Sequence, residues 1–250
     1  PNYDEVDLVH YPYFDFFFRT LPLNKPKPTV VTIHDAIPLV FPAAYPPGIK
    51  GKLSFFLQKF SLNSTAAIIT DSHQSTKDVI SYLNQPAEKV HTVYLAPNSG
   101  YKHKEETVVE RVLKRYGLKK PYLLYVGDIN YNKNLPELLD AFKEMATDVS
   151  LVLVSKALTR DNPAARSLFS VIDSFELRDS LHILTGVPAL PAEDLPALYS
   201  GALWYVQPSL YEGFGLPVLE AMACQTAVIS SMGGSLKEIV KDAGLTFDPN

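Results

Sequence analysis

Short apolar runs alternate with helix-like segments along most of this 250-residue chain. Such alternation is typical of α/β folds, in which helices connect the strands of a mainly parallel sheet. The expected strands are short and rich in β-branched or apolar residues: Val6–His10, Thr29–His34, Ala67–Thr70, Val90–Tyr94, Tyr122–Val126, Ser150–Val154, Leu181–Leu184, Ala202–Val206 and Ala227–Ile229. The expected helices are Gly51–Asn63, Ser75–Leu83, Thr107–Tyr116, Leu135–Met145, Ala164–Phe175, Leu195–Ser200 and Pro217–Met222.

A polar stretch between Pro97 and Lys120 interrupts this pattern. It predicts an N-terminal α/β unit over residues 1–97, a connector over 98–120 and a C-terminal α/β unit over 121–250. Open parallel sheets bind ligands beyond the carboxyl ends of their strands, so functional residues are expected just after strand ends.

Composition and charge narrow the class of protein. The chain is 46% hydrophobic and 20% charged, as globular domains are, and its net charge of −4 offers no general basic surface for nucleic acid. The single Cys224 excludes an internal disulfide and fits a reducing compartment. No apolar run reaches the roughly 18 residues that span a membrane, and no signal peptide is visible at Pro1. We expect a cytoplasmic protein that is trimmed at both ends.

The segment from Pro208 to Ala223, PSLYEGFGLPVLEAMA, carries the strongest functional signal. A strand ends before it, a glycine-flanked loop follows, and Pro217 suits the first turn of a helix. A helix start of this kind offers unpaired N–H groups and the positive end of the helix dipole. The glycines let the backbone approach a ligand closely, so the loop suits a phosphate or a polar sugar edge.

Two carboxylates, Glu212 and Glu220, bracket this loop. An ionised carboxylate can accept hydrogen bonds from two neighbouring hydroxyls, as on a ribose or a hexose. Glu212 could hold a transferred sugar, or offset positive charge at an oxocarbenium-like carbon. The alternative interpretation is that Glu212 is a turn residue and Glu220 an exposed helix residue.

The same segment closely resembles the signature of glycosyltransferase family 4, with both acids eight positions apart around Gly213-Phe214-Gly215-Leu216-Pro217. The resemblance covers nearly the whole chain. Further matching stretches are Thr32–Asp35, Ile68–Ser72, Tyr125–Gly127, Lys133–Leu135, His182–Val187, Ala227–Ser231 and Gly234–Pro249. Of these, His182–Val187 resembles the family's base-binding turn.

The resemblance implies a GT-B fold of two Rossmann-like domains with parallel sheets flanked by helices, of which the first, acceptor-side domain is incomplete. It also implies retaining stereochemistry, no metal and no other cofactor, because the nucleotide-diphosphate sugar is the substrate. The implied catalytic residues are Glu212, His34 and Lys133. The implied donor-binding residues are Glu220, Gly213, Phe214, Gly215, Leu216, Val187, Gly127 and Asp128.

Lys133 and His34 also have plainer interpretations. Lys133 precedes a helix, where it would neutralise the leaving diphosphate or simply be a solvated turn lysine. His34 ends a strand, where it would contact donor sugar or acceptor, or be a hydrogen-bonded structural histidine. Many relatives carry Arg where this chain has Asp128 or Asn132, so one cation is missing or comes from elsewhere, Lys156 being a candidate.

Three further residues or stretches have simpler expectations. Ser72 is expected to cap the following helix, which would explain it fully. Cys224 is expected to pack rather than react. The aromatic run Tyr11–Phe18 predicts a buried wall, or else a patch that faces acceptor or membrane.

The functional hypothesis is a retaining transferase that moves a hexose to a glycan or lipid-linked acceptor, with peripheral membrane contact at the inner face. The stretch His34–Leu39 resembles the mannosyltransferase-like branch that builds surface polysaccharide, which favours GDP-mannose as donor. One alternative is a nucleotide-sugar-binding fragment without useful turnover. Another is a sugar-nucleotide epimerase on the same fold, against which the Glu212/Glu220 pair argues.

Overall fold

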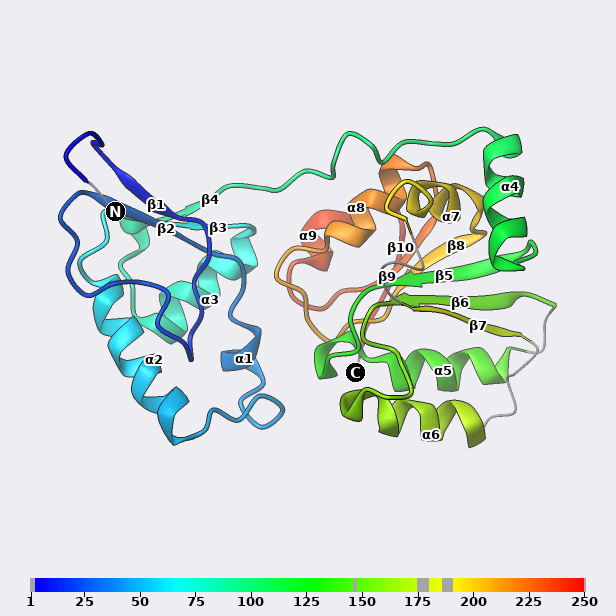
Figure 1. Ribbon diagram of the computed structural model, residues 1–250, viewed down its shortest axis with the longest axis horizontal. Helices are drawn as coiled ribbons and strands as arrows, with labels where there is room; N and C mark the ends of the chain where they lie inside the picture. The colour runs from blue at the N-terminus through cyan, green and yellow to red at the C-terminus, as the bar shows by residue number, and fades with distance from the viewer. Residues whose placement is uncertain (1–2, 146–147, 175–179, 186–190, 250) are drawn as a thin grey trace. The chain divides into compact units, whose positions relative to one another are not determined.

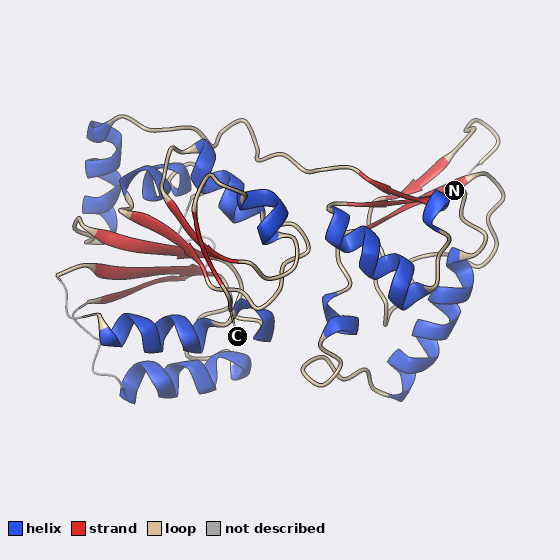
Figure 2. Ribbon diagram, turned by 180° about the vertical axis from the view of Figure 1, so that it is seen from behind, coloured by secondary structure: helices blue, strands red, loops and turns tan. Residues whose placement is uncertain are grey.

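The computed structural model describes residues 3–145, 148–174, 180–185 and 191–249. The chain forms two compact α/β units (Figures 1 and 2). The N-terminal unit extends to Leu95 and includes the short segment Glu212–Phe214. The C-terminal unit comprises Ala96–Tyr211 and the residues from Gly215 onward.

Within the described residues, the N-terminal unit contains a parallel sheet with strand order β1-β2-β3-β4. Its strands are β1 (Val9–Tyr11), β2 (Thr29–Ile33), β3 (Ala67–Thr70) and β4 (Val90–Thr92). Its helices are α1 (Ile37–Val40), α2 (Ile49–Leu62), α3 (His73–Leu83) and the 3-10 helix η1 (Ala87–Lys89). All of these strands run the same way, as the sequence pattern predicts.

The core of this unit lies between the sheet and its helices. Val31, Ile33 and Ile68 of the sheet pack with residues of α2 and α3, all with almost no exposed surface. The aromatic run divides between core and surface, since Phe14 and Phe16 are buried whereas Tyr13 and Phe18 are 57% and 71% exposed. The expected buried wall is therefore wrong for Tyr13 and Phe18, because this segment is irregular and turns its side chains in different directions.

The described part of the C-terminal unit holds a second parallel sheet, with strand order β10-β9-β8-β5-β6-β7. Its strands are β5 (Tyr122–Val126), β6 (Ser150–Ser155), β7 (Leu181–Thr185), β8 (Trp204–Gln207), β9 (Val228–Ser231) and β10 (Leu245–Phe247). Its α-helices are α4 (Glu106–Tyr116), α5 (Leu135–Glu144), α6 (Arg166–Ser174), α7 (Leu195–Gly201), α8 (Leu216–Ala223) and α9 (Leu236–Val240). The 3-10 helices are η2 (Tyr131–Lys133) and η3 (Pro163–Ala165).

Alternating side chains of the central strands supply two cores, one on each face of this sheet. Leu123 and Tyr125 pack under α5 and α6. Tyr122 and Leu124 face the opposite way, toward α4, α7, α8 and α9. Figure 1 shows α5 and α6 together on one side of the sheet and α4, α7 and α8 on the other. The predicted α/β class with parallel sheets flanked by helices is confirmed.

Several element boundaries differ from the prediction. The first strand is Val9–Tyr11 rather than Val6–His10, because the parallel register pairs Val9 with Thr29 and leaves Val6 exposed. The elements α1, α9 and β10 were not expected, since each is five residues or shorter and too brief to show a period. Phe175, the expected last residue of one helix, lies outside the described residues.

Candidate functional site

The glycine loop leads from β8 directly into α8. Gly215 is the N-cap of α8 and has φ of +100°, a conformation that favours glycine. A Cβ atom there would also lie 2.9 Å from Leu236 Cδ2. Leu216 and Pro217 form the first turn, so the predicted strand–glycine loop–helix arrangement is present at this position.

A second turn leaves the sheet beside the first. β5 pairs in parallel with β8, so the loops that follow these two strands start at the same edge of the sheet. A side chain at Gly127 would have to displace the Tyr125 hydroxyl, because a Cβ atom would lie 2.6 Å from Tyr125 Oη. That hydroxyl donates to the Asp128 carbonyl at 2.6 Å, and the exposed Asp128 carboxylate accepts the Ile129 N–H at 2.8 Å.

Asn132 and Lys133 follow in the 3-10 helix η2, just before α5. Asn132 is 2% exposed; its Nδ2 donates to Tyr211 O at 2.9 Å, and its carbonyl accepts the Leu210 N–H at 2.8 Å. Asn132 therefore ties this turn to the segment that leads into Glu212, a role that sequence reasoning missed by treating the position only as a lost cation. Lys133 is half-buried, and Lys156 is exposed directly after β6.

Glu220 extends from α8 and is half-buried. The Tyr199 hydroxyl donates to its Oε2 at 2.9 Å. Burial raises the pKa of this carboxyl group above its ordinary value, and the phenols of Tyr199 and Tyr101 offset part of that rise. The alternative of an exposed helix residue is therefore wrong for Glu220.

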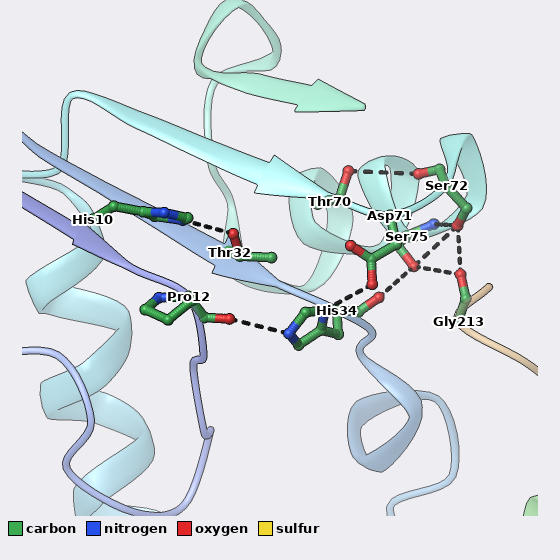
Figure 3. Close-up of polar contacts among 9 residues, drawn as sticks. All are labelled: His10, Pro12, Thr32, His34, Thr70, Asp71, Ser72, Ser75 and Gly213. Atoms are coloured by element: carbon green, nitrogen blue, oxygen red, sulfur yellow. Dashed lines mark hydrogen bonds and ion pairs between the residues drawn. The ribbon is translucent and has the colours of Figure 1, made fainter. Parts of the chain in front are cut away.

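His34 lies at the end of β2 with acceptors at both ring nitrogens (Figure 3). Nδ1 is 2.7 Å from Asp71 Oδ2, and Nε2 is 3.1 Å from the Pro12 carbonyl. Only the doubly protonated ring can donate at both positions. Asp71 accordingly raises the His34 pKa, with smaller contributions from Pro12 and Asp35 and opposition from burial.

The same corner of the N-terminal unit holds Gly213 (Figure 3). Ser72 caps α3 by accepting the Ser75 N–H at 2.9 Å, as predicted, but its hydroxyl also donates to the Gly213 carbonyl at 2.7 Å. Capping alone therefore does not explain Ser72. The Ser75 hydroxyl lies 3.0 Å from the same carbonyl, and a Cβ atom on Gly213 would lie 2.5 Å from Asp35 Cβ.

Glu212 and Phe214, on either side of Gly213, are 7% and 6% exposed, and the Phe214 ring packs against Tyr94. The N-terminal unit thus assembles Glu212, Gly213, Phe214 and His34, whereas Gly127, Asp128, Lys133, Gly215, Leu216 and Glu220 belong to the C-terminal unit. Neither Ser75 nor Asp71 was predicted as a site residue from the sequence, although a serine and an acid beside a helix start are a usable signal. Val187 lies outside the described residues.

Two further expectations concern reactive or metal-binding groups. Cys224 is fully buried in a core, and burial raises the pKa of its thiol to about 11, which fits a packing residue. In the ranges that the structure describes, no cluster of three or more His, Cys, Asp or Glu could hold a metal ion. Across those same ranges, no helix is both long and apolar enough to cross a membrane.

The raised His34 pKa predicts a pH-dependent contribution to stability. The contacts of the protonated ring are fully present below the ordinary histidine pKa of about 6.5 and are lost as the pH rises through the higher folded-state value. An NMR titration of the His34 ring should therefore give a midpoint above 6.5, and Asp71→Asn should lower it. Asp7→Asn changes an exposed carboxylate of the same unit and should leave the midpoint in place; an unshifted midpoint in Asp71→Asn would contradict the assignment.

Two family models match the chain. Residues 110–250 match the model described as glycosyl transferases group 1, and residues 2–99 match the model described as Glycosyltransferase Family 4. The chain is 34% identical over 228 residues to O-antigen chain mannosyltransferase B of Escherichia coli, covering 88% of this chain and 57% of the relative. It is 28% identical to O-antigen chain mannosyltransferase RfbU of Salmonella typhimurium, covering 93% of this chain and 59% of the relative.

Solved structures give the same fold. The crystal structure of Anabaena Alr3699/HepE in complex with UDP-glucose superposes with a TM-score of 0.74 at 19% identity, covering 90% of this chain and 59% of that one. At that identity the likeness is one of fold. The chain therefore spans less than two thirds of the length of each of these similar proteins.

Proposed function

Because this chain belongs to the glycosyltransferase group 1 family, we propose that it acts as a retaining glycosyltransferase that uses a nucleotide-diphosphate sugar. The observation that carries the proposal is the pair of turns at one edge of the C-terminal sheet. One turn ends at Gly215 and the start of α8, and the other carries Gly127 and Lys133. A helix N-terminus and a lysine at one sheet edge suit a diphosphate.

The proposed roles of the residues follow the chemistry of each group. Glu220 accepts hydrogen bonds from the ribose hydroxyls, and Lys133 neutralises the leaving diphosphate. The amides of Phe214, Gly215 and Leu216 bind sugar and phosphate oxygens, and Gly127, Asp128 and Val187 complete the donor site. Glu212 binds the transferred sugar and offsets positive charge at its anomeric carbon, and His34 contacts donor sugar or acceptor.

For the donor we propose a hexose, with mannose as the first choice and GDP as its nucleotide. Two of the relatives are named O-antigen chain mannosyltransferases, which supports mannose as the sugar and a glycan as the acceptor. The proposed acceptor is such a glycan, free or lipid-linked. The UDP-glucose complex of a protein with the same fold makes UDP-sugars the main competing donors. The proposal includes no metal and no nucleic-acid partner.

Turnover separates this proposal from the alternative of a binding fragment without useful activity. Purified protein would be incubated with GDP-mannose or UDP-glucose, and release of nucleoside diphosphate measured with and without a mannose-terminated acceptor. Release that depends on the sugar nucleotide, and that Glu212→Ala and Lys133→Ala abolish, supports the transferase. Binding without release supports the fragment, and a donor isomerised without acceptor would indicate an epimerase.

We also propose peripheral contact with an anionic membrane at the inner face, through one face of α2. Four exposed apolar residues recur along this helix at helical spacing: Ile49, Leu53, Phe56 and Phe60. Three lysines accompany them, Lys50, Lys52 and Lys59, and the helix sequence contains no acid. An exposed apolar stripe with basic neighbours is typical of helices that lie in the interface of an anionic bilayer.

The membrane contact predicts co-sedimentation with phosphatidylglycerol vesicles and much weaker co-sedimentation with phosphatidylcholine vesicles. Leu53→Ser combined with Phe56→Ser should reduce binding about tenfold or more, because both side chains lose apolar burial in the interface. Leu245→Ser replaces a comparably exposed apolar residue of the C-terminal unit and serves as the control. Equal binding by the double variant and the control would exclude α2 as the contact.

A further inference from the structure

Glu220 is supported from within the C-terminal unit by two tyrosines. Tyr199 of α7 has no exposed surface, and its hydroxyl donates to Glu220 Oε2 at 2.9 Å. Tyr101, from the segment before α4, is a second phenol that acts on the same carboxyl group and lowers its pKa. The two rings pack edge to face with their centroids 6.0 Å apart, so the two phenols that act on Glu220 also pack against each other.

The Tyr199 hydroxyl donates to a carboxylate, whereas the hydroxyls of three other buried tyrosines of this unit donate to uncharged oxygens. Tyr122 donates to the Leu198 carbonyl at 2.7 Å, Tyr125 donates to the Asp128 carbonyl, and Tyr205 donates to the Gln207 amide oxygen. Those contacts satisfy neutral groups of the fold. A partly buried carboxylate is costly unless donors compensate its charge, so Tyr199 and Tyr101 offset a cost that a neutral residue at position 220 would avoid.

We propose that Tyr199 and Tyr101 are positioning residues for Glu220: from the interior they hold its carboxylate in place and keep it ionised, so that it can accept hydrogen bonds from the two ribose hydroxyls of a nucleoside diphosphate. The inference rests on the proposed role of Glu220 and deepens it. A carboxylate fixed in one orientation loses less conformational freedom when the nucleotide binds.

The titratable groups that face Glu220 are few among the described residues. They are Tyr101 from the segment before α4, Tyr199 from α7, and Cys224, which follows the end of α8 and lies near Lys104. Burial raises the pKa of both phenols and of the thiol, so all three are neutral near pH 7. A change in binding at mildly acidic pH that depends on Tyr199 therefore reports on Glu220 itself.

The test compares Tyr199→Phe, which removes the hydrogen bond to Glu220, with Tyr122→Phe as a matched control. The control likewise removes one hydrogen bond of a buried phenol, in this case the bond from Tyr122 to the Leu198 carbonyl of α7. Affinity for UDP and for GDP would be measured by calorimetry from pH 5 to pH 8. Tyr199→Phe should weaken binding about tenfold at pH 7 and move the acid limb of the profile to higher pH, because the lost hydrogen bond favoured the ionised carboxylate. Tyr122→Phe should leave the profile unchanged, and Tyr101→Phe, at a half-buried position, should act in the same direction as Tyr199→Phe.

A second readout does not require nucleotide binding. The side-chain carboxyl carbon of Glu220, assigned with Glu220→Gln, would be titrated by ¹³C NMR. Its midpoint should rise in Tyr199→Phe and stay in place in Tyr122→Phe. If the wild-type chain binds neither UDP nor GDP, the proposed function fails while the NMR titration still decides the tyrosine contacts. Equal profiles and equal midpoints in the two phenylalanine variants would overturn the inference.

Discussion

Glu212→Gln is expected to slow release of nucleoside diphosphate from the sugar donor about 10²–10³-fold. Glutamine keeps the shape of a side chain that is 7% exposed, so the change removes charge with little disturbance of packing. A neutral amide cannot offset positive charge at the anomeric carbon, which develops in the transition state rather than in the bound donor. The rate should therefore fall far more than the affinity for the nucleotide, as measured by single-turnover kinetics and calorimetry.

Glu110→Gln provides the control, because Glu110 is an exposed residue of α4 in a helix with no proposed role. Its rate should match that of the wild type. A Glu212→Gln chain with an unchanged rate would remove Glu212 from the chemistry and leave it as the turn residue that the sequence also allowed. A loss confined to affinity would indicate binding rather than transition-state stabilisation.

Lys133→Ala is expected to weaken binding of a nucleoside diphosphate about 10- to 100-fold. A charge-assisted hydrogen bond to phosphate contributes about 1.5–3 kcal/mol, which corresponds to that range. A nucleoside monophosphate lacks the outer phosphate, so its affinity should change much less. The comparison of UDP with UMP, or of GDP with GMP, locates the lysine on the diphosphate rather than on the base or ribose.

Lys133→Arg tests whether charge alone suffices at this position, and it should retain most of the affinity. Lys156→Ala tests the other lysine that the sequence offered as a replacement cation, which is exposed after β6. If Lys156→Ala costs as much as Lys133→Ala, both cations serve the diphosphate. If Lys133→Ala binds UDP and UMP with wild-type affinity, Lys133 is the solvated turn lysine of the plainer interpretation.

The sequence predicted the α/β class well because buried strands and amphipathic helices have different patterns of apolar residues. Buried strands such as Tyr122–Val126 are continuous apolar runs, and their limits in the structure match the prediction. Short elements escaped it: α1 has four residues, and α9 has five. Their ends depend on tertiary contacts, which no local pattern encodes.

In the candidate site, too, local features could be predicted from the sequence, whereas contacts between distant residues could not. The glycine requirement at Gly215 was predictable, because a helix start after a glycine loop has a recognisable pattern. The contacts of Ser72 with Gly213 and of Asn132 with Tyr211 were not, since each joins residues at least 79 positions apart. Its place before a helix identified Ser72 as a cap, and the family resemblance marked Asn132 as a position where many relatives carry Arg. Neither gave a sign that the side chain holds the backbone next to Glu212.

A thermal-shift screen of the wild-type chain against UDP-, GDP- and ADP-sugars tests the central claim most directly. A ligand that binds only the folded state adds about 2.7 kcal/mol of stability at 100 times its Kd, which raises the melting temperature by several degrees. We expect at least one sugar nucleotide to raise it, with GDP-mannose first, and Glu220→Ala to reduce the shift. A melting temperature that no sugar nucleotide changes, at concentrations up to several millimolar, would contradict donor binding by this chain.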